Sequence, residues 1–182
     1  GAIASRLLDG TMIPAITRVG ELFDKKQYFL PQLIASAETM KKGVEFLEPH
    51  LKQSDEGSSR KLGVILLATV EGDIHDIGKN IVALMFKNRG FDVIDLGKDV
   101  AAEKIIKEIK KHKPVIVGLS ALMTTTMVNM KKVLDLAKRD GVDSNFIVGG
   151  AAVTKTYAES IGAEYAKDGV EAVRVAEKLA KR

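Results

Sequence analysis

The sequence contains no cysteine and no tryptophan, and only 5% of its residues are aromatic. The absence of cysteine excludes disulfides, iron–sulfur clusters and thiolate zinc sites, and it leads us to expect a reducing, cytoplasmic location. The charges nearly balance, with 28 Lys and Arg against 24 Asp and Glu. Basic and acidic residues are mixed along stretches such as 102–113, which is typical of a solvated helix face. With so few aromatic rings, a nucleic-acid-binding surface is not expected.

Long apolar runs are also missing. The longest, VILLATV at 64–70, is far shorter than the roughly 18 residues that a membrane-spanning helix needs. No signal peptide is recognisable, so we expect no membrane association. The chain opens with GAIASRLLDG, without methionine and with helical periodicity almost at once. We therefore expect a piece of a longer chain that carries a short cloning scar.

The apolar pattern divides the chain into two halves. In residues 1–51 apolar side chains recur at steps of three and four, as one buried face of a helix requires: they are Ile3, Leu7, Leu8, Ile13, Ile16, Val19, Leu22 and Phe23, then Leu33, Ile34, Ala37, Met40, Val44 and Leu47. Pro31 suits the first turn of the second helix, and Pro49 follows its last apolar position. Residues 52–61, KQSDEGSSRK, are polar and rich in glycine and serine, as linkers are.

In residues 62–182 short apolar runs alternate with amphipathic helical segments. The runs are 62–69, 91–96, 114–120, 145–150 and a weak one at 163–166. Because the runs are continuous and do not alternate with polar residues, each strand is expected to be buried on both faces. We therefore predict an α/β fold in which a five-stranded parallel sheet of the flavodoxin or Rossmann-like kind, with strand order 2-1-3-4-5, lies between helices.

Ligands of such sheets bind at the carboxyl ends of the strands, where the winding reverses between the first and third strands. The loops expected there are TVEGDIHDIG (69–78), SALMTTT (120–126) and GGAAVT (149–154). They concentrate the Gly, Ser, Thr, Asp and His of this half. The dinucleotide pattern G-x-G-x-x-G and the phosphate-binding pattern G-x-x-x-x-G-K-[ST] are both missing, so the usual nucleotide cofactors are disfavoured.

His75 lies between two aspartates in the first of these loops, and two interpretations are open. It could be a metal ligand whose second ring nitrogen binds Asp73 or Asp76, or it could simply cap the helix that follows. A single imidazole cannot hold zinc, which needs three or four ligands. The other histidines, His50 and His112, fall at helix ends away from this crevice. If His75 binds a metal, the remaining ligands come from elsewhere, as a macrocycle would supply them.

At these residues the sequence resembles a known family. GDIHDIGKN (72–80), GLSAL (118–122) and VGG (148–150) look like the D-x-H-x-x-G, S-x-L and G-G signature of cobalamin-binding domains. The stretch VGELFDKKQYFLPQLIASAETM (19–40) resembles the helical cap of methionine synthase and related corrinoid methyl carriers. The resemblance runs from about residue 7 to the end. It implies a helical cap domain at 1–51, the linker at 52–61 and a Rossmann-like cobalamin domain at 62–182.

The resemblance also implies roles for single residues. Cobalamin would bind with its nucleotide base displaced and with His75 as the lower axial ligand of cobalt, while Asp73 holds His75 and passes a proton toward Thr126, which stands where the family often has serine. Ser120, Leu122 and Thr124 would line the pocket of the displaced tail, with room left by Gly78, Gly149 and Gly150. Gly72, Asp76 and Ile77 complete the expected cofactor-binding set.

Three apolar residues of the helical half, Phe23, Leu30 and Leu33, would by the same resemblance cover the upper face of the corrin. The alternative for them is the ordinary core of a helix bundle. Apolar shielding is chemically reasonable, because cob(I)alamin is a strong nucleophile that water and oxygen consume. The linker would let the cap swing aside for each transfer.

The expected function is methyl transport, with the corrinoid alternating between methylcobalamin and cob(I)alamin. We expect the cobalamin module of methionine synthase, which would serve methyltetrahydrofolate and homocysteine domains and a reactivation domain or protein, and which could not complete a transfer alone. The alternative is a free-standing corrinoid protein of a methanol, methylamine or aryl-ether methyltransferase system. Adenosylcobalamin mutases, cobalamin-dependent regulators and response regulators are disfavoured. Mutases normally lack such a helical cap, a DNA-binding segment is missing, and so is an acidic cluster after the first strand.

Overall fold

The computed structural model describes residues 2–52 and 62–180 of the chain. It divides into two compact units, Gly1–Ser58 and Ser59–Arg182, and each is described by itself. The expected linker at 52–61 lies, apart from Lys52, outside the described residues, so the domain boundaries of the sequence analysis stay a prediction. In the described part of the chain, no helix combines the length and apolarity needed to cross a membrane.

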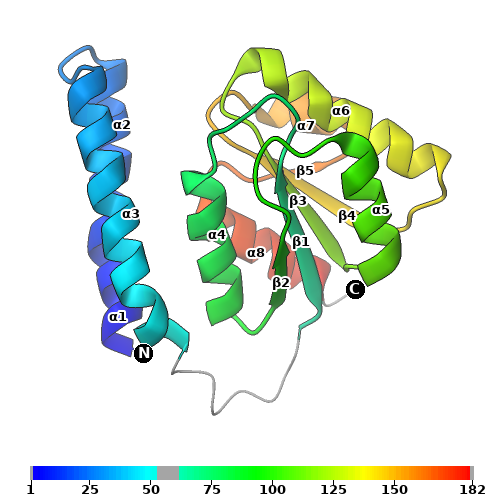
Figure 1. Ribbon diagram of the computed structural model, residues 1–182, viewed down its shortest axis with the longest axis horizontal. Helices are drawn as coiled ribbons and strands as arrows, with labels where there is room; N and C mark the ends of the chain where they lie inside the picture. Colours follow the sequence, from blue (N-terminus) through cyan, green and yellow to red (C-terminus); the bar gives the residue numbers. More distant parts are fainter. Residues whose placement is uncertain (1, 53–61, 181–182) are drawn as a thin grey trace. The chain divides into compact units, whose positions relative to one another are not determined.

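The first unit is helical. It contains α1 (Ala2–Leu7), a five-residue π-helical segment η1 (Leu8–Met12), α2 (Ile13–Asp24) and α3 (Leu30–Lys52) (Figure 1). A proline at the start of α2 suits a position where the backbone N–H has no helical partner. Helix α3 continues past Pro49 to Lys52, whereas the sequence led us to expect a helix before this proline.

Few side chains of the helical unit are buried. Leu8, Met40 and Leu47 are at most 6% exposed, as the apolar periodicity predicted. Ile3, Leu7, Phe23 and Ile34 were expected on the same buried face, but they are 38–69% exposed. Two antiparallel helical stretches bury only the stripe along which they touch, so apolar residues beside that stripe stay exposed.

The second unit is an α/β sandwich. Its elements are β1 (Val64–Thr69), α4 (Ile77–Asn88), β2 (Asp92–Asp95), α5 (Ala102–His112), β3 (Ile116–Ser120), α6 (Thr124–Arg139), β4 (Asn145–Gly149), α7 (Lys155–Ile161), β5 (Glu164–Tyr165) and α8 (Gly169–Leu179). All strand pairs are parallel and the order is β2-β1-β3-β4-β5. The predicted fold and strand order are confirmed.

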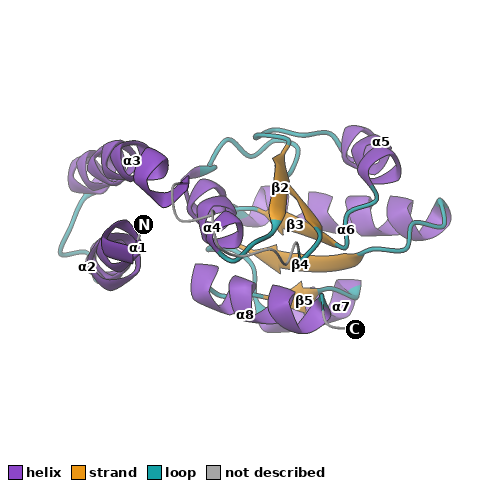
Figure 2. Ribbon diagram, turned by 90° about the horizontal axis from the view of Figure 1, so that it is seen from below, coloured by secondary structure: helices purple, strands orange, loops and turns teal. Residues whose placement is uncertain are grey.

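Helices cover both faces of the sheet (Figure 2). Side chains of α5, α6 and α7 pack with alternate residues of the central strands in one apolar cluster, which includes Leu66, Ala68 and Leu119. The intervening residues point to the opposite face, where α4 and α8 pack against each other. Burial on both faces explains why these strands are continuous apolar runs.

The central strands place two loops side by side. Strands β1 and β3 are neighbours, and Thr69 lies directly opposite Ser120 at their carboxyl ends. The loop after β1 and the loop after β3 therefore begin at the same edge of the sheet. This edge is the switch point at which an open parallel sheet of this order binds its ligands.

Candidate functional site

The loop after β1, residues 70–76 and here called the His75 loop, begins with a tight turn. The Asp73 N–H donates to the Val70 carbonyl at 3.1 Å. Gly72 has φ +80°, the positive value that the third position of a type II turn requires and that glycine adopts without steric cost. The turn reverses the chain at the end of the strand and directs Asp73 into the protein, where it is fully buried.

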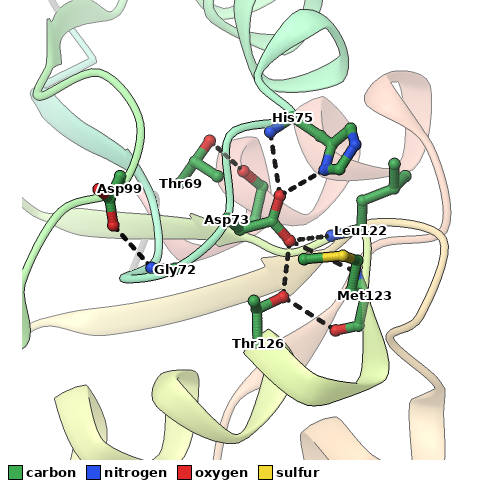
Figure 3. Close-up of polar contacts among 9 residues, drawn as sticks. Thr69, Gly72, Asp73, His75, Asp99, Leu122, Met123 and Thr126 are labelled. Atoms are coloured by element: carbon green, nitrogen blue, oxygen red, sulfur yellow. Dashed lines mark hydrogen bonds and ion pairs between the residues drawn. The ribbon is translucent and has the colours of Figure 1, made fainter.

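The Asp73 carboxylate links the two loops (Figure 3). Its Oδ1 accepts the His75 backbone N–H at 3.0 Å and lies 2.8 Å from His75 Nδ1. Its Oδ2 accepts the Leu122 N–H at 2.7 Å, the Met123 N–H at 3.4 Å and the Thr126 hydroxyl at 2.7 Å. One oxygen therefore serves the His75 loop, and the other holds the loop and helix that follow β3.

The surroundings keep Asp73 ionised. Burial acts to raise the pKa of this carboxyl group, but the hydrogen bonds from Thr126, from the backbone of His75 and Leu122, and from the His75 side chain outweigh it. The pKa of Asp73 therefore lies well below its usual range. A buried carboxylate that accepts several hydrogen bonds is a permanent anion at neutral pH.

The His75 imidazole is bound on one side and open on the other. Its side chain is 45% exposed, while the carboxylate that contacts Nδ1 is fully buried. An anion beside Nδ1 favours the tautomer with the proton on that nitrogen, which leaves the lone pair of Nε2 directed away from Asp73. The helix-cap alternative is wrong, because the N-cap of α4 is Asp76 and no side chain caps this helix end. Of the two aspartates proposed as partners of the ring, the contact is with Asp73.

Thr126 lies on the far side of the same carboxylate. It is the third residue of α6 and is 6% exposed. Its Oγ1 is 2.7 Å from Asp73 Oδ2 and 3.0 Å from the Met123 carbonyl. The structure thus brings His75, Asp73 and Thr126 together in that order, as the resemblance implied. The second acceptor near the hydroxyl is a backbone carbonyl of the same loop.

Small and polar residues occupy the sheet face toward α4 and α8 at this edge. Thr69 is fully buried, and its hydroxyl lies 2.8 Å from that of Ser120. By strand register and alternation, Gly118 and Gly149 share this face with Ser120. The carboxyl edge of this face therefore carries no bulky side chain at these four positions.

The three glycines expected to make room for the nucleotide tail, Gly78, Gly149 and Gly150, have different surroundings. A Cβ on Gly150, at φ +121°, would lie 2.1 Å from the Ala121 carbonyl oxygen, and one on Gly149 would lie 2.7 Å from that of Ala166. The packing of the chain on itself therefore requires both glycines, with or without a ligand. At Gly78, in contrast, nothing lies within 4 Å of the added atom, so this position faces open space.

The remaining predicted residues of the second unit surround His75 or begin the next helices. Leu122 is 44% exposed and Ile77 37% exposed, which is high for large apolar side chains. Thr124 is the first residue of α6 and is exposed, as is Gly72. These exposed residues lie in the loops after β1 and β3 and at the starts of α4 and α6, at the same edge of the sheet as His75.

The three predicted residues of the helical unit form a separate group. Phe23 lies in the last turn of α2 and is 38% exposed, and Leu33, in the first turns of α3, is half-buried. The side chain of Leu30 lies outside the described part of the chain. Phe23 is therefore not plain bundle core, and a role as a cofactor cover stays a prediction.

The donor set near His75 fits one kind of metal group. Among the described residues, no three His, Cys, Asp or Glu side chains come together as a metal site. The site offers one imidazole with a free side, held by a buried anion, next to small and polar residues at the ends of β1 and β3. This suits a cofactor that carries its metal in its own macrocycle and needs one axial ligand.

Sequence reasoning missed several residues that hold the His75 loop. Asp99 accepts the Gly72 N–H at 2.7 Å, and the Asn129 amide donates to the Glu71 carbonyl at 2.8 Å. Asp99 follows the second strand, so its place at the same sheet edge could have drawn attention to it. Asn129 lies mid-helix, and no local pattern marks it.

An ion pair between a buried lysine and a partly exposed aspartate was also missed. The Lys79 side chain is 3% exposed, and its Nζ donates to both carboxylate oxygens of Asp95, at 2.6 and 2.5 Å, and to Asn80 Oδ1 at 2.7 Å. Lys79 belongs to the first turn of α4, and Asp95 ends β2. The pair ties the helix that follows His75 to the edge of the sheet.

Family models match both units. A model described as "B12 binding domain" matches residues 63–177, and a second model with the same description matches residues 2–48. The first match spans the whole of the sheet with the His75 loop, and the second spans the helical unit. Together, the two matches identify the combination of a helical cap and a cobalamin-binding domain, which the motifs and the helices of residues 19–40 had indicated.

Curated relatives extend along nearly the whole chain. A protein of Methanosarcina mazei named "Trimethylamine corrinoid protein 2" is 41% identical over 179 residues, which cover 95% of this chain and 82% of the relative. "Dimethylamine corrinoid protein 2" of Methanosarcina acetivorans is 39% identical over 178 residues, with coverage of 96% and 82%.

Solved structures similar to this chain also include a corrinoid protein and a cobalamin methyltransferase complex. The monomethylamine corrinoid protein of Methanosarcina barkeri superposes with a TM-score of 0.84 at 32% identity and covers 97% of this chain and 84% of that one. The methanol:cobalamin methyltransferase complex MtaBC of the same organism gives a TM-score of 0.66, again at 32% identity, with coverage of 100% and 69%.

These comparisons correct one expectation. The sequence led us to expect a module of methionine synthase, and hence part of that enzyme and of methionine biosynthesis; this assignment is wrong, because the matched relatives are corrinoid proteins named for methylamines. The folate-type and homocysteine-type partner domains were expected only for methionine synthase, so we withdraw them with it. The motifs around His75 and the helices of residues 19–40, on which the resemblance was based, did not distinguish the two groups of carriers that the sequence analysis considered.

Proposed function

Because this chain belongs to the family of B12-binding domains, we propose that it is the corrinoid protein of a methyltransferase system that uses a methylated amine. Cobalamin is its cofactor. The relatives named for trimethylamine and dimethylamine support the amine. A partner methyltransferase, a reactivating protein and a cytoplasmic location belong to the same proposal.

One observation carries the site assignment: an exposed imidazole whose Nδ1 lies 2.8 Å from a fully buried, ionised aspartate. We propose that His75 is the lower axial ligand of cobalt through Nε2. Asp73 fixes the tautomer and the orientation of the ring, and its negative charge raises the basicity of the ligating nitrogen. When bound, the cofactor supplies a cobalt centre that accepts and gives up a methyl group.

The other residues of the site hold the Asp73 carboxylate or border the proposed slot for the displaced nucleotide tail. Thr126 and the Leu122 N–H hold Asp73 Oδ2, so the carboxylate cannot turn away when the ring moves. Proton movement between His75, Asp73 and Thr126, expected from the resemblance, is part of this proposal, because the three groups are within hydrogen-bond distance. Ser120, Gly149 and Gly78 border the proposed slot of the displaced nucleotide tail.

The ligand assignment is tested by the absorption spectrum of protein reconstituted with methylcobalamin. We expect the spectrum of histidine-ligated cobalamin for the wild type and its loss in His75→Gly. His112→Gly is the matched control, because His112 ends α5 and pairs with Glu108 of the same helix. A His75→Gly spectrum identical to that of the wild type would contradict the assignment.

The substrate class is tested by methyl transfer. The loaded, reduced protein is mixed with purified methyltransferases for trimethylamine, dimethylamine, monomethylamine or methanol, each with its own methylated substrate. We expect methylation of the bound corrinoid with one of the amine enzymes at a rate at least about tenfold above that with the methanol enzyme, a difference of about 1.4 kcal/mol in activation free energy. Preference for the methanol enzyme would overturn the amine assignment and leave the carrier function standing.

A further inference from the structure

Three consecutive residues of the His75 loop have their backbone held by other elements. The Asn129 amide of α6 donates to the Glu71 carbonyl at 2.8 Å. The Gly72 N–H donates to Asp99 Oδ1 at 2.7 Å, and the Asp99 N–H donates to the Asp73 carbonyl at 3.0 Å. Asp99 therefore binds the two peptide groups on either side of the one that joins Gly72 to Asp73, namely the N–H of the Glu71–Gly72 peptide and the carbonyl of the Asp73–Ile74 peptide.

Asp99 has an unusual backbone conformation. Its φ is +52°, in the left-handed region, and only Lys26 and Lys113 share a positive φ among the described non-glycine residues. Both lysines follow the ends of helices, where a left-handed residue is common. Asp99 lies between a strand and a helix, so helix termination does not account for its conformation. An aspartate tolerates this region better than most residues, but it is still less favourable than the right-handed one.

The left-handed conformation of Asp99 determines which backbone groups this residue can bind. It allows the side chain of Asp99 to bind Gly72 and its backbone N–H to bind Asp73. Figure 3 shows the side-chain bond to Gly72. Bridge pairing of Val70 with Val100 fixes the two loops beside it. The left-handed geometry of Asp99 is thus compensated by two hydrogen bonds to the turn that carries Asp73.

His75 depends on that turn for its position. The His75 backbone N–H and the ring Nδ1 are both hydrogen-bonded to Asp73 Oδ1. A small rotation of the Gly72–Asp73 peptide would move the carboxylate and, with it, the ring. The orientation of the imidazole therefore rests on Asp73, and the backbone of Asp73 rests on Asp99.

We propose that Asp99 is a positioning residue for the axial imidazole, which it orients by holding the backbone of Gly72 and Asp73 through the Gly72 N–H and the Asp73 carbonyl. The proposal rests on the function proposed above and adds to it a residue outside the D-x-H-x-x-G motif. What matters is a side-chain oxygen that accepts the Gly72 N–H at residue 99, together with a backbone that tolerates a positive φ.

Two substitutions separate these requirements. Asp99→Asn keeps an acceptor oxygen and tolerates the left-handed region, so it should behave as the wild type. Asp99→Gly accepts the conformation without strain but removes the acceptor. Asp143→Gly, in the exposed loop between α6 and β4, is the matched control for a glycine introduced into a loop.

The first readout uses the protein without cofactor. Amide hydrogen exchange at Gly72 and His75 should rise about fivefold or more in Asp99→Gly relative to strand amides such as Val117, because losing one hydrogen bond shifts local opening by that order. Side-chain nitrogen spectra should show His75 changing from mainly Nδ1-protonated to a mixture of tautomers. Urea unfolding of the same samples shows whether the fold is retained.

The second readout is the spectrum of the methylcobalamin-loaded protein at one fixed pH. We expect Asp99→Gly to lose a substantial part of the histidine-ligated form, and Asp99→Asn and Asp143→Gly to keep it. Unchanged exchange and tautomer at His75 in Asp99→Gly, or the same loss in Asp99→Asn, would overturn the role of Asp99. If the wild type itself lacks the histidine-ligated spectrum, the proposed function fails, while the cofactor-free measurements still test Asp99.

Discussion

The helical unit and the sheet unit use their apolar side chains differently. In the sheet unit, large apolar side chains such as Phe86, Ile105 and Leu66 are buried in the core and are at most 1% exposed. In the helical unit, Phe29 is 63% and Phe46 71% exposed. Two helical stretches can bury only one stripe each, whereas a sheet covered on both faces buries whole strands. The difference indicates that the sheet unit supplies most of the stability and that the helical unit presents apolar side chains to solvent.

The contrast between the two units is tested most directly by replacing one phenylalanine in each unit with alanine. Phe86→Ala should lower the free energy of unfolding by about 3–5 kcal/mol, because it leaves a cavity in a packed core. Phe46→Ala should change it by less than about 0.5 kcal/mol, as surface substitutions do. Urea unfolding of the cofactor-free protein measures both, and similar losses for the two variants would contradict the contrast.

The second prediction concerns how the site is anchored in the stable unit. Because the fold lowers the pKa of Asp73, the charged form stabilises the folded state. This contribution is complete above about pH 5 and is lost as the pH falls below the usual value near 3.9 toward the lowered one. Asp73→Asn should therefore be less stable at neutral pH, by about 1–3 kcal/mol.

The difference between wild type and Asp73→Asn should narrow as the solution is acidified, and unfolding curves of the cofactor-free protein at a series of pH values measure it. Asp135→Asn is the control, because this aspartate forms an exposed ion pair with Lys131 on α6 and should matter by less than about 1 kcal/mol. A difference independent of pH would show that Asp73 acts through its shape and not through its charge.

The third prediction has the smallest effect on stability and concerns the helical unit. If Phe23 shields the cobalt–carbon bond, Phe23→Ala should speed photolysis of bound methylcobalamin and cost less than about 1 kcal/mol of stability, since the side chain is 38% exposed. Phe46→Ala is the matched control on the same unit. Equal photolysis rates in wild type and Phe23→Ala would make Phe23 an ordinary helix residue.

Most of the sheet unit could be predicted from the sequence because its signals are local. A continuous apolar run such as VILLAT marks a strand buried on both faces, and the switch point of the sheet then places His75 near Thr126, 51 residues further along the chain. The helical unit was predicted less well, because periodicity marks an apolar stripe but does not say how much of it a partner covers. Ile3 and Ile34 therefore turned out to be exposed.

The residues that escaped prediction act through the backbone. Asp99 binds peptide groups of Gly72 and Asp73, and such contacts leave no periodicity and no motif. Gly149 and Gly150 were expected to make room for a ligand, yet carbonyl oxygens of Ala166 and Ala121 lie where their side chains would be. Spacing alone cannot distinguish a glycine required by a ligand from one required by a neighbouring strand or loop.

The two outer strands of the sheet have a consequence for how this protein meets others. Strand β2 has four residues and exposed aspartates at both ends, and β5 has only two residues, one of them the exposed Glu164. Short, charged edges are poor templates for an added strand from another chain. If the chain carries methyl groups between enzymes, as proposed, its encounters would then depend on loops and helix faces, which separate more readily than a sheet continued across two proteins.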